Sequence, residues 1–235
     1  MSANKKRITT VLLDAGGVIL DESEHEEVRA DIAVGILSTV NPGYSADSYC
    51  LDIEEAVDSF CPSTYQYVFY KYLRNNQSLF DKAYRLYLET WQQRKPPLKL
   101  NAGIEREVRL ISQSFKLGIA GQYGSELLKV LKEASILDYF SYQLTQDDFA
   151  ITKPDPRYYE EITKAFGVDS RECIMVGDRI DKDIIPAKQL GMRTVLVRIG
   201  LHENQQPRIP FEVPDAEVNG ILGLASIVEQ VARMK

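Results

Sequence analysis

The chain has 235 residues, of which 44% are hydrophobic and 26% are charged, and its formal net charge is −6. This composition is typical of a water-soluble globular protein, and the length allows one large core or a core with a smaller domain. The negative charge argues against a nucleic-acid-binding protein, because affinity for a phosphate backbone requires concentrated Lys and Arg.

The N-terminal segment contains the first predicted strand. Residues 8–14 read ITTVLLD, a run rich in β-branched residues that ends before two glycines, which predicts a buried strand followed by a tight turn. The apolar run reaches Asp14 within a few residues, so it is too short for a signal peptide or a membrane span. The chain has three cysteines and no CxxC pair, which argues against a disulfide framework. We therefore expect a reduced, cytoplasmic protein with no membrane partner.

Residues 24–93 form a predicted all-helical block. Apolar residues recur there at helical spacing, and no strand pattern interrupts them. The aromatic-rich segment TYQYVFYKYL, residues 64–73, and Trp91 fit the interior of such a block better than a substrate-binding wall. The Pro-rich segment RKPPLKL, residues 94–100, marks the end of the block. The block is therefore an insertion just after the first strand.

Strands and helices alternate through the rest of the chain. We expect helices over residues 105–115, 125–134, 156–166 and 183–191, and strands over residues 116–121, 140–145, 172–178 and 193–199. A short strand and a helix follow within residues 216–234. This alternation predicts a parallel α/β sheet with crossover helices on its faces. Ser125 is expected to cap the helix that follows it, and residues 202–210 to form a surface loop.

Charged residues lie where several predicted strands end. Asp14 closes the first strand, and Lys153 stands ahead of a helix. Asp178 and Asp183 follow a later strand, while Asp181 between them is interpreted as a solvated loop charge. Because the carboxyl ends of strands carry the ligand site in open α/β sheets, we expect the other four side chains to converge. Carboxylates beside one lysine suit a hard divalent cation, best Mg²⁺, which would offset the repulsion between an anionic nucleophile and a phosphate.

Four segments together resemble the motifs of the haloacid dehalogenase-like (HAD) hydrolase superfamily. VLLDAGGVILD matches its first motif, KLGIAGQ its second, ITKPDP its third and VGDRIDKDI its fourth. The resemblance extends over nearly the whole chain. It implies a Rossmann-like parallel α/β core, formed by residues 1–21 and 100–235, with an all-helical cap domain of residues 22–99 inserted after the first strand.

The resemblance also implies the roles of the residues at the site. Asp14 would be the nucleophile that forms an aspartyl-phosphate, a covalent role open to carboxylates. Asp183 would contact the metal through water or orient Lys153. The Mg²⁺ ligands that the resemblance implies are Asp14, the backbone carbonyl of Gly16, Asp178 and Asp183. The groups that it assigns to the phosphate of a small phosphorylated substrate are Gly16, Gly17, Gly121, Gln122 and Lys153.

The sequence departs from the phosphatase pattern at three positions. Gly16 replaces the second Asp of DxDGT, the general acid and base, and Val18 replaces the Thr. Gly121 replaces the Ser or Thr of the second motif. Loss of the proton shuttle should lower turnover by on the order of 10²- to 10⁴-fold for a poor leaving group. Retention of Asp178 favours phosphoryl or phosphonyl chemistry over haloacid chemistry, because the dehalogenases of the family need no metal.

Three functions remain open from the sequence. The first is a Mg²⁺-dependent phosphatase of a small phosphorylated metabolite. The second is a catalytically weak or inactive relative that binds a phosphorylated ligand or a partner protein. The third is hydrolysis of a phosphonate or another carbon bond, for which Lys71 and Lys82 are Schiff-base candidates by location alone. The sequence indicates no nucleic-acid partner and no particular oligomeric state.

Overall fold

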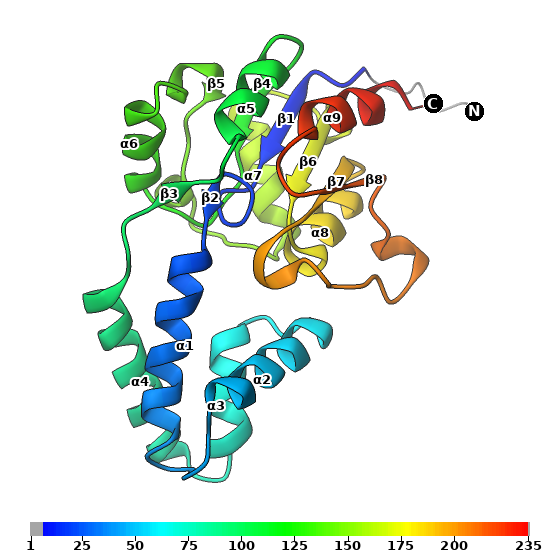
Figure 1. Cartoon of the computed structure of the whole chain (residues 1–235). Coiled ribbons are helices and arrows are strands. Elements are labelled where there is room, and N and C mark those ends of the chain that lie inside the picture. Colours follow the sequence, from blue (N-terminus) through cyan, green and yellow to red (C-terminus); the bar gives the residue numbers. More distant parts are fainter. Residues whose placement is uncertain (1–6, 235) are drawn as a thin grey trace. The chain divides into compact units, whose positions relative to one another are not determined.

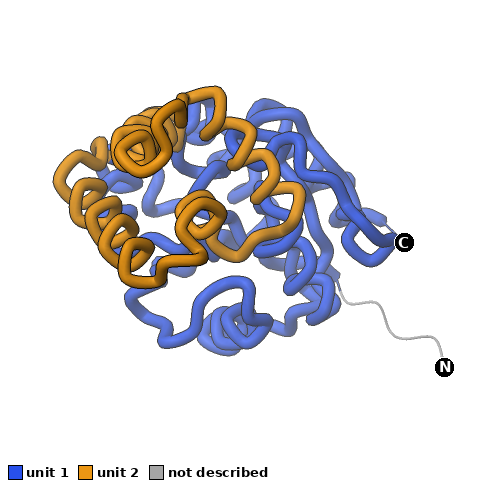
Figure 2. The backbone as a smooth tube through the Cα atoms, turned by 90° about the horizontal axis from the view of Figure 1, so that it is seen from below, with its two compact units in different colours: residues 1–21, 98–235 blue, residues 22–97 orange. Residues whose placement is uncertain are grey.

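A computed structural model of the chain describes residues 7–234 (Figure 1). The chain divides into two compact units, which Figure 2 shows in different colours. The sheet unit comprises residues 1–21 and 98–235, and the helical unit comprises residues 22–97. No helix among the described residues is long and apolar enough to cross a membrane.

The sheet unit is built on one six-stranded parallel sheet, which confirms the predicted α/β fold. Its strands, in spatial order, are β5 (Phe140–Tyr142), β4 (Lys116–Ile119), β1 (Thr10–Leu13), β6 (Cys173–Gly177), β7 (Arg193–Arg198) and β8 (Ala216–Asn219). β1 lies between β4 and β6, so the residues that follow these three strands share one edge of the sheet.

Helices cover both faces of this sheet (Figure 1). Val11 and Leu13 of β1 pack into one apolar cluster with α5, α6 and α9, whereas Leu12 packs into a second cluster with α7. A strand that is buried on both faces needs a continuous apolar run, which is why TVLL shows no polar alternation. The helices of this unit are α5 (Ile104–Ser112), α6 (Glu126–Glu133), α7 (Pro156–Phe166), α8 (Ile185–Gln189) and α9 (Leu224–Arg233).

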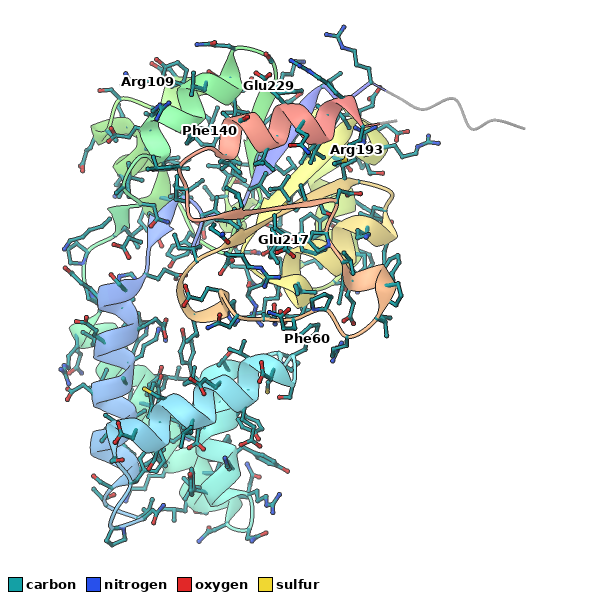
Figure 3. The ribbon with its side chains drawn as sticks, turned by 45° about the vertical axis from the view of Figure 1, so that its right-hand side comes forward. Phe60, Arg109, Phe140, Arg193, Glu217 and Glu229 are labelled. Carbon is teal, nitrogen blue, oxygen red and sulfur yellow. The ribbon has the colours of Figure 1, made fainter. Side chains whose placement is uncertain are left out.

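Polar contacts join β7 to β8 and α9. Figure 3 labels Arg193 of β7 and Glu217 of β8, which take part in them. The Arg198 guanidinium lies 2.8 Å from the Glu217 carboxylate of β8. Arg193 donates hydrogen bonds to the backbone carbonyls of Val231 and Met234 at the end of α9. These contacts attach the last strand and the last helix to the centre of the sheet.

The helical unit contains α1 (Ser23–Leu37), α2 (Ala46–Asp58), α3 (Thr64–Leu73) and α4 (Gln77–Arg94). Its interior is aromatic: the rings of Phe69 and Tyr87 lie 5.1 Å apart and Trp91 is buried. The prediction of core aromatics is confirmed for Phe69 and Trp91. It is wrong for Tyr70 and Tyr72 of α3, which are 52% and 37% exposed.

The chain leaves and re-enters the sheet unit through a short antiparallel pair of strands. β2 (Leu20–Asp21) precedes the helical unit, and β3 (Lys99–Leu100) follows it. Leu20 pairs with Leu100, and Asp21 pairs with Lys99. Both connections are therefore fixed to each other on the sheet-unit side.

Two local expectations differ from the structure. Ser125 does precede α6, but its hydroxyl forms no capping hydrogen bond with the described residues, because its backbone is helical where a capping residue is usually extended. Its backbone N–H instead donates to Asp147, at 2.8 Å. The segment 202–210 is not wholly at the surface, since the side chains of His202 and Gln205 are buried.

Candidate active site

Asp14 lies at the carboxyl end of the central strand β1, where the sheet ends. Its backbone N–H donates to the carbonyl of Val176 in β6, at 2.9 Å, which continues the ladder by one residue. One carboxylate oxygen, Oδ1, accepts the Ala15 N–H at 2.7 Å. Asp14 is only 8% exposed, so its orientation is fixed by both the sheet and the following turn.

Lys153 joins two of the predicted site carboxylates. Its ammonium nitrogen lies 2.7 Å from Oδ1 of Asp14 and 2.5 Å from Oδ1 of Asp183. The lysine side chain is 2% exposed. A buried ammonium group at these distances forms charge-assisted hydrogen bonds with both carboxylates and fixes their separation.

Asp183 is held from several sides. Its Oδ1 also accepts the hydroxyl of Tyr159 at 3.1 Å, and its Oδ2 accepts the Arg179 N–H at 3.1 Å. A Cβ on Gly177 would lie 2.3 Å from the Asp183 carboxyl carbon, so only glycine fits there. The sequence did not predict Tyr159 as a partner of Asp183, because the two residues are 24 positions apart and no local pattern links them.

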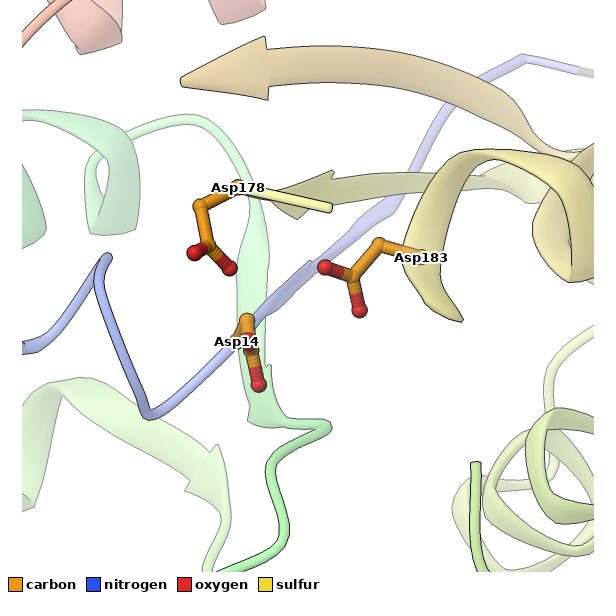
Figure 4. A group of neighbouring side chains, drawn as sticks. All are labelled: Asp14, Asp178 and Asp183. Atoms are coloured by element: carbon orange, nitrogen blue, oxygen red, sulfur yellow. The ribbon is translucent and has the colours of Figure 1, made fainter. Parts of the chain in front are cut away.

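Asp178 completes a cluster of three carboxylates. Figure 4 shows the side chains of Asp14, Asp178 and Asp183 near one another at the ends of β1 and β6 and in the turn that follows β6. One oxygen from each lies within 4.8 Å of the others, and all three residues are buried. The carboxylates outnumber the Lys153 ammonium group by two charges. An all-oxygen donor set with this excess of negative charge fits a divalent cation such as Mg²⁺.

Burial and neighbouring charges shift the pKa values of Asp14 and Lys153. Burial raises the pKa of Asp14 to about 6, and the charge of Asp183 adds to this, although Lys153 opposes both. Burial alone would lower the pKa of Lys153, but the carboxylates of Asp14 and Asp183 outweigh it and hold that pKa well above its usual range. Lys153 therefore stays protonated between the carboxylates of Asp14 and Asp183.

The turn after Asp14 requires glycine. Gly17 has a φ of 69°, and a Cβ there would lie 2.7 Å from Oδ2 of Asp178. The carbonyl oxygen of Gly16 accepts the Val18 N–H at 2.7 Å. Because a carbonyl oxygen has two lone pairs, this hydrogen bond leaves one acceptor site of Gly16 for a cation.

Gly121 has no room for the hydroxyl side chain that the motif resemblance implies at this position. A Cβ on Gly121 would lie 2.2 Å from the Cβ of Ala15 and 2.6 Å from its backbone nitrogen. The Gly121 carbonyl accepts the hydroxyl of Tyr158 at 3.0 Å. Its neighbour Gln122 is exposed. The two strand ends are thus packed backbone against backbone.

The expectation that Asp181 is a solvated loop charge is wrong. Its side chain is only 11% exposed and forms an ion pair with Arg179, at 2.6 Å. Gln205 from the segment after β7 donates to Asp181 at 3.2 Å and accepts the Ile180 N–H at 2.7 Å. Asp181 therefore neutralises Arg179 and connects the π-helical turn Ile180–Ile184 to the neighbouring loop.

These features define an α/β protein with a buried carboxylate and lysine site at the carboxyl ends of its central strands. A family model described as haloacid dehalogenase-like hydrolase matches residues 31–197, and the chain belongs to this family. The matched range includes Lys153, Asp178 and Asp183 and begins after Asp14. The resemblance inferred from the four motifs is confirmed.

Several relatives are named as phosphatases. Glyceraldehyde 3-phosphate phosphatase of Methanopyrus kandleri is 31% identical over 127 residues, which cover 54% of this chain and 54% of that relative. Phosphoserine phosphatase of Thermus thermophilus is 38% identical over 88 residues, which cover 37% of this chain and 34% of that relative. The chain thus spans about half the length, or less, of these relatives.

Solved structures share the fold over almost their whole length. A Haemophilus somnus protein described as a predicted phosphoglycolate phosphatase has a TM-score of 0.66 and 17% identity, and the match covers 95% of this chain and 99% of that chain. A HAD hydrolase of Bacillus subtilis solved with bound magnesium has a TM-score of 0.59 and 17% identity, with 97% and 100% coverage. At these identities the likeness shows the fold alone.

Proposed function

We propose that this chain is a Mg²⁺-dependent phosphohydrolase that acts on a small phosphorylated metabolite, with Asp14 as its nucleophile. The observation that carries the proposal is the buried contact of Lys153 with Asp14 and Asp183, beside the carboxylate of Asp178. Membership of the family and the phosphatase names of relatives support the same reaction class.

Each side chain has a role that follows from its contacts. Asp14 attacks phosphorus through a carboxylate oxygen and forms an aspartyl-phosphate, which water then hydrolyses. Lys153 neutralises charge on Asp14 and on the phosphoryl oxygens, and Asp183 fixes the position of Lys153. Asp14, Asp178, Asp183 and the Gly16 carbonyl would hold Mg²⁺, which when bound supplies the positive charge that brings two anions together.

The leaving group must depart without the usual acid. Gly16 has no side chain to protonate it, because the Asp that serves as general acid in the family pattern is missing at this position. Substrates whose leaving group is already acidic, such as acyl phosphates and sugar 1-phosphates, should therefore react best. We further propose that the helical unit serves as the cap that selects the substrate, a role that lids of this kind perform.

The test is phosphate release from a panel of substrates, measured with and without Mg²⁺. The panel contains acetyl phosphate, sugar 1-phosphates, aryl phosphates and glyceraldehyde 3-phosphate, the last because several relatives bear its name. Asp14→Asn should abolish release, since the amide is isosteric but not nucleophilic. The matched control is Asp169→Asn, which alters an aspartate at the opposite end of β6 and should retain activity.

A weakly active or inactive phosphate-binding protein is the second candidate. The close packing of Gly121 against Ala15 favours it, because a phosphoryl-binding hydroxyl is excluded by structure and not merely absent. Failure of the wild-type chain to release phosphate from any substrate in the panel, with Mg²⁺ binding intact, would favour this candidate instead.

Phosphonate hydrolysis is disfavoured by the state of Lys71. Hydrogen bonds to Asp52 and Glu55, at 2.6 and 2.5 Å, hold the pKa of Lys71 above its usual range. Schiff-base formation requires a neutral amine, so an ion-paired lysine is a poor candidate. Borohydride trapping with a phosphonoaldehyde would test both Lys71 and the exposed Lys82.

A further inference from the structure

Asn101 holds the turn that follows Asp14, although it lies outside the four motifs. It comes directly after β3 and is 9% exposed. Its side-chain nitrogen Nδ2 donates to the carbonyl oxygens of Gly17 at 2.6 Å, Val18 at 3.1 Å and Leu20 at 3.1 Å. Its backbone N–H donates to the carbonyl oxygen of Ile19, at 2.9 Å. One residue thus satisfies four consecutive carbonyls.

The chemistry of this contact admits few other side chains. Carbonyl oxygens only accept hydrogen bonds, so the amide nitrogen, with its two hydrogens, must face them. An aspartate of the same shape would direct a carboxylate oxygen at the same carbonyls. A side chain without donors would leave buried carbonyls unpaired, which is destabilising. The contact therefore depends on the donors of Asn101 and not on its shape.

The turn that Asn101 holds is the one that shapes the candidate active site. Within it, Ile19 and Leu20 donate back to the carbonyl of Ala15, at 3.1 and 2.8 Å. These bonds close the loop around Gly16, whose carbonyl is a candidate metal ligand, and place Gly17 against Asp178. A change in the turn would move both glycines relative to the carboxylate cluster.

Asn101 also lies where the chain returns from the helical unit. The antiparallel pair of β2 and β3 joins the two connections, and Asn101 spans from the second connection to the turn before the first. Asn101 therefore joins residues 17–20 to the second connection, in addition to the pairing of Leu20 with Leu100.

We propose that Asn101 is a positioning residue that keeps residues 16–20 in the conformation required for Mg²⁺ binding and turnover. The kinetic part of this proposal rests on the proposed phosphohydrolase function. The structural part does not, because the state of the turn and the affinity for Mg²⁺ can be measured without turnover.

The experiment compares Asn101→Ala and Asn101→Asp with wild type and with Thr194→Val. Thr194 is a matched control, since it is buried in the same unit and its hydroxyl donates to Asp215 at 3.0 Å, away from the turn. Hydrogen exchange by mass spectrometry reports on residues 14–22, and calorimetric titration gives the Kd for Mg²⁺. Steady-state kinetics gives kcat and KM for any substrate that the wild type hydrolyses.

We expect Asn101→Ala to speed exchange in residues 16–20 by at least about 10-fold, to weaken Mg²⁺ binding several-fold and to lower kcat more than it raises KM. Asn101→Asp should be worse than Asn101→Ala in all three, although it is closer in shape. Thr194→Val should leave the exchange of the turn and the Mg²⁺ affinity unchanged. If Asn101→Ala does not fold, Asn101→Ser replaces it. Serine retains one hydrogen-bond donor, so we expect changes in the same directions but of smaller magnitude.

Unchanged exchange and unchanged Mg²⁺ affinity in the Ala or Ser variant would overturn the proposal. The proposal would also be overturned if Asn101→Asp bound Mg²⁺ as tightly as Asn101→Ala or more tightly, and exchanged no faster. That result would indicate that Asn101 acts through its shape and packing. An inactive wild type would refute the proposed function alone, because the exchange and Mg²⁺ measurements would still decide the role of Asn101.

Discussion

A substitution at Gly121 gives the most direct test of how the two strand ends are packed. Gly121→Ser restores the hydroxyl usual in related phosphatases, and Gly121→Ala adds the Cβ alone. That Cβ would lie 2.2 Å from the Cβ of Ala15 and 2.6 Å from its nitrogen, whereas carbon atoms in contact prefer about 3.5–4.0 Å. Since β1 and β4 are hydrogen-bonded neighbours, relief requires the backbone itself to shift.

The expected loss of stability is large for one methyl group. Overpacking typically destabilises by about 1–3 kcal/mol, and contact with backbone atoms puts Gly121→Ala at the upper end. At about 2–4 °C per kcal/mol for a chain of this size, the melting temperature should fall by about 6–12 °C. The same shift would displace Asp14, which precedes Ala15, so activity should fall in the Ser variant as well.

Calorimetry and phosphate release measure the two effects. Gly35→Ala is the matched control, because that glycine lies inside α1 with nothing within 4 Å of an added Cβ. It should stabilise the helical unit slightly, as Ala does in a helix. Adding Ala15→Gly to Gly121→Ala removes the nearest contact and should recover part of the loss. If Gly121→Ala has the same melting temperature as the wild type, the inference that Gly121 lies too close to Ala15 for a Cβ is wrong.

Three further predictions concern the site and its support. Gly16→Asp should raise activity on alkyl phosphates by up to about 10²-fold, because it returns a general acid, and unchanged rates would contradict the account of the missing acid. Lys153→Met should destabilise by about 3–5 kcal/mol in EDTA, since it leaves Asp14 and Asp183 buried without their counter-charge, and Mg²⁺ should restore part of this; a melting curve equal to wild type would exclude it. Burial, and then the nearby positive charges, lower the pKa of His202 to about 3, so the folded state binds fewer protons than the unfolded state. The free energy of unfolding should therefore fall by about 2 kcal/mol between pH 7 and pH 5 because of His202. Urea unfolding at the two pH values measures this loss, and His202→Phe should remove it.

The sequence predicted best those elements whose limits are set by nearby residues. The helix expected at 156–166 matches α7 because Asp155 caps it, Pro156 opens it and Gly167, with a φ of 64°, ends it. The strand expected at 140–145 instead ends at Tyr142, because Thr145 begins a capping box with Asp148. The apolar pattern that predicted the strand contains no information about this capping box, which takes the backbone of Thr145 out of the strand.

The site was predictable where the motif residues themselves make the contacts. The convergence of Asp14, Lys153 and Asp183 follows from the rule that strand ends meet at one edge. The supports of these residues were not predictable. Asn101 lies 84 residues from Gly17, and Gln205 lies 25 residues from Ile180, so neither contact produces a local pattern.

Two of the departures from the phosphatase pattern lie on either side of Ala15. Gly16 follows Ala15 directly in the chain, and a Cβ on Gly121 would lie 2.2 Å from the Cβ of Ala15. The absence of a hydroxyl at position 121 therefore follows from the approach of β4 to the turn after Asp14, and it could not be reversed by one substitution. The three carboxylates lie close together at the same edge of the sheet, with one oxygen of each within 4.8 Å of the others. This site lacks both the general acid at position 16 and the hydroxyl at position 121. We therefore expect catalysis to depend on Asp14, on Lys153 and on a leaving group that needs little protonation.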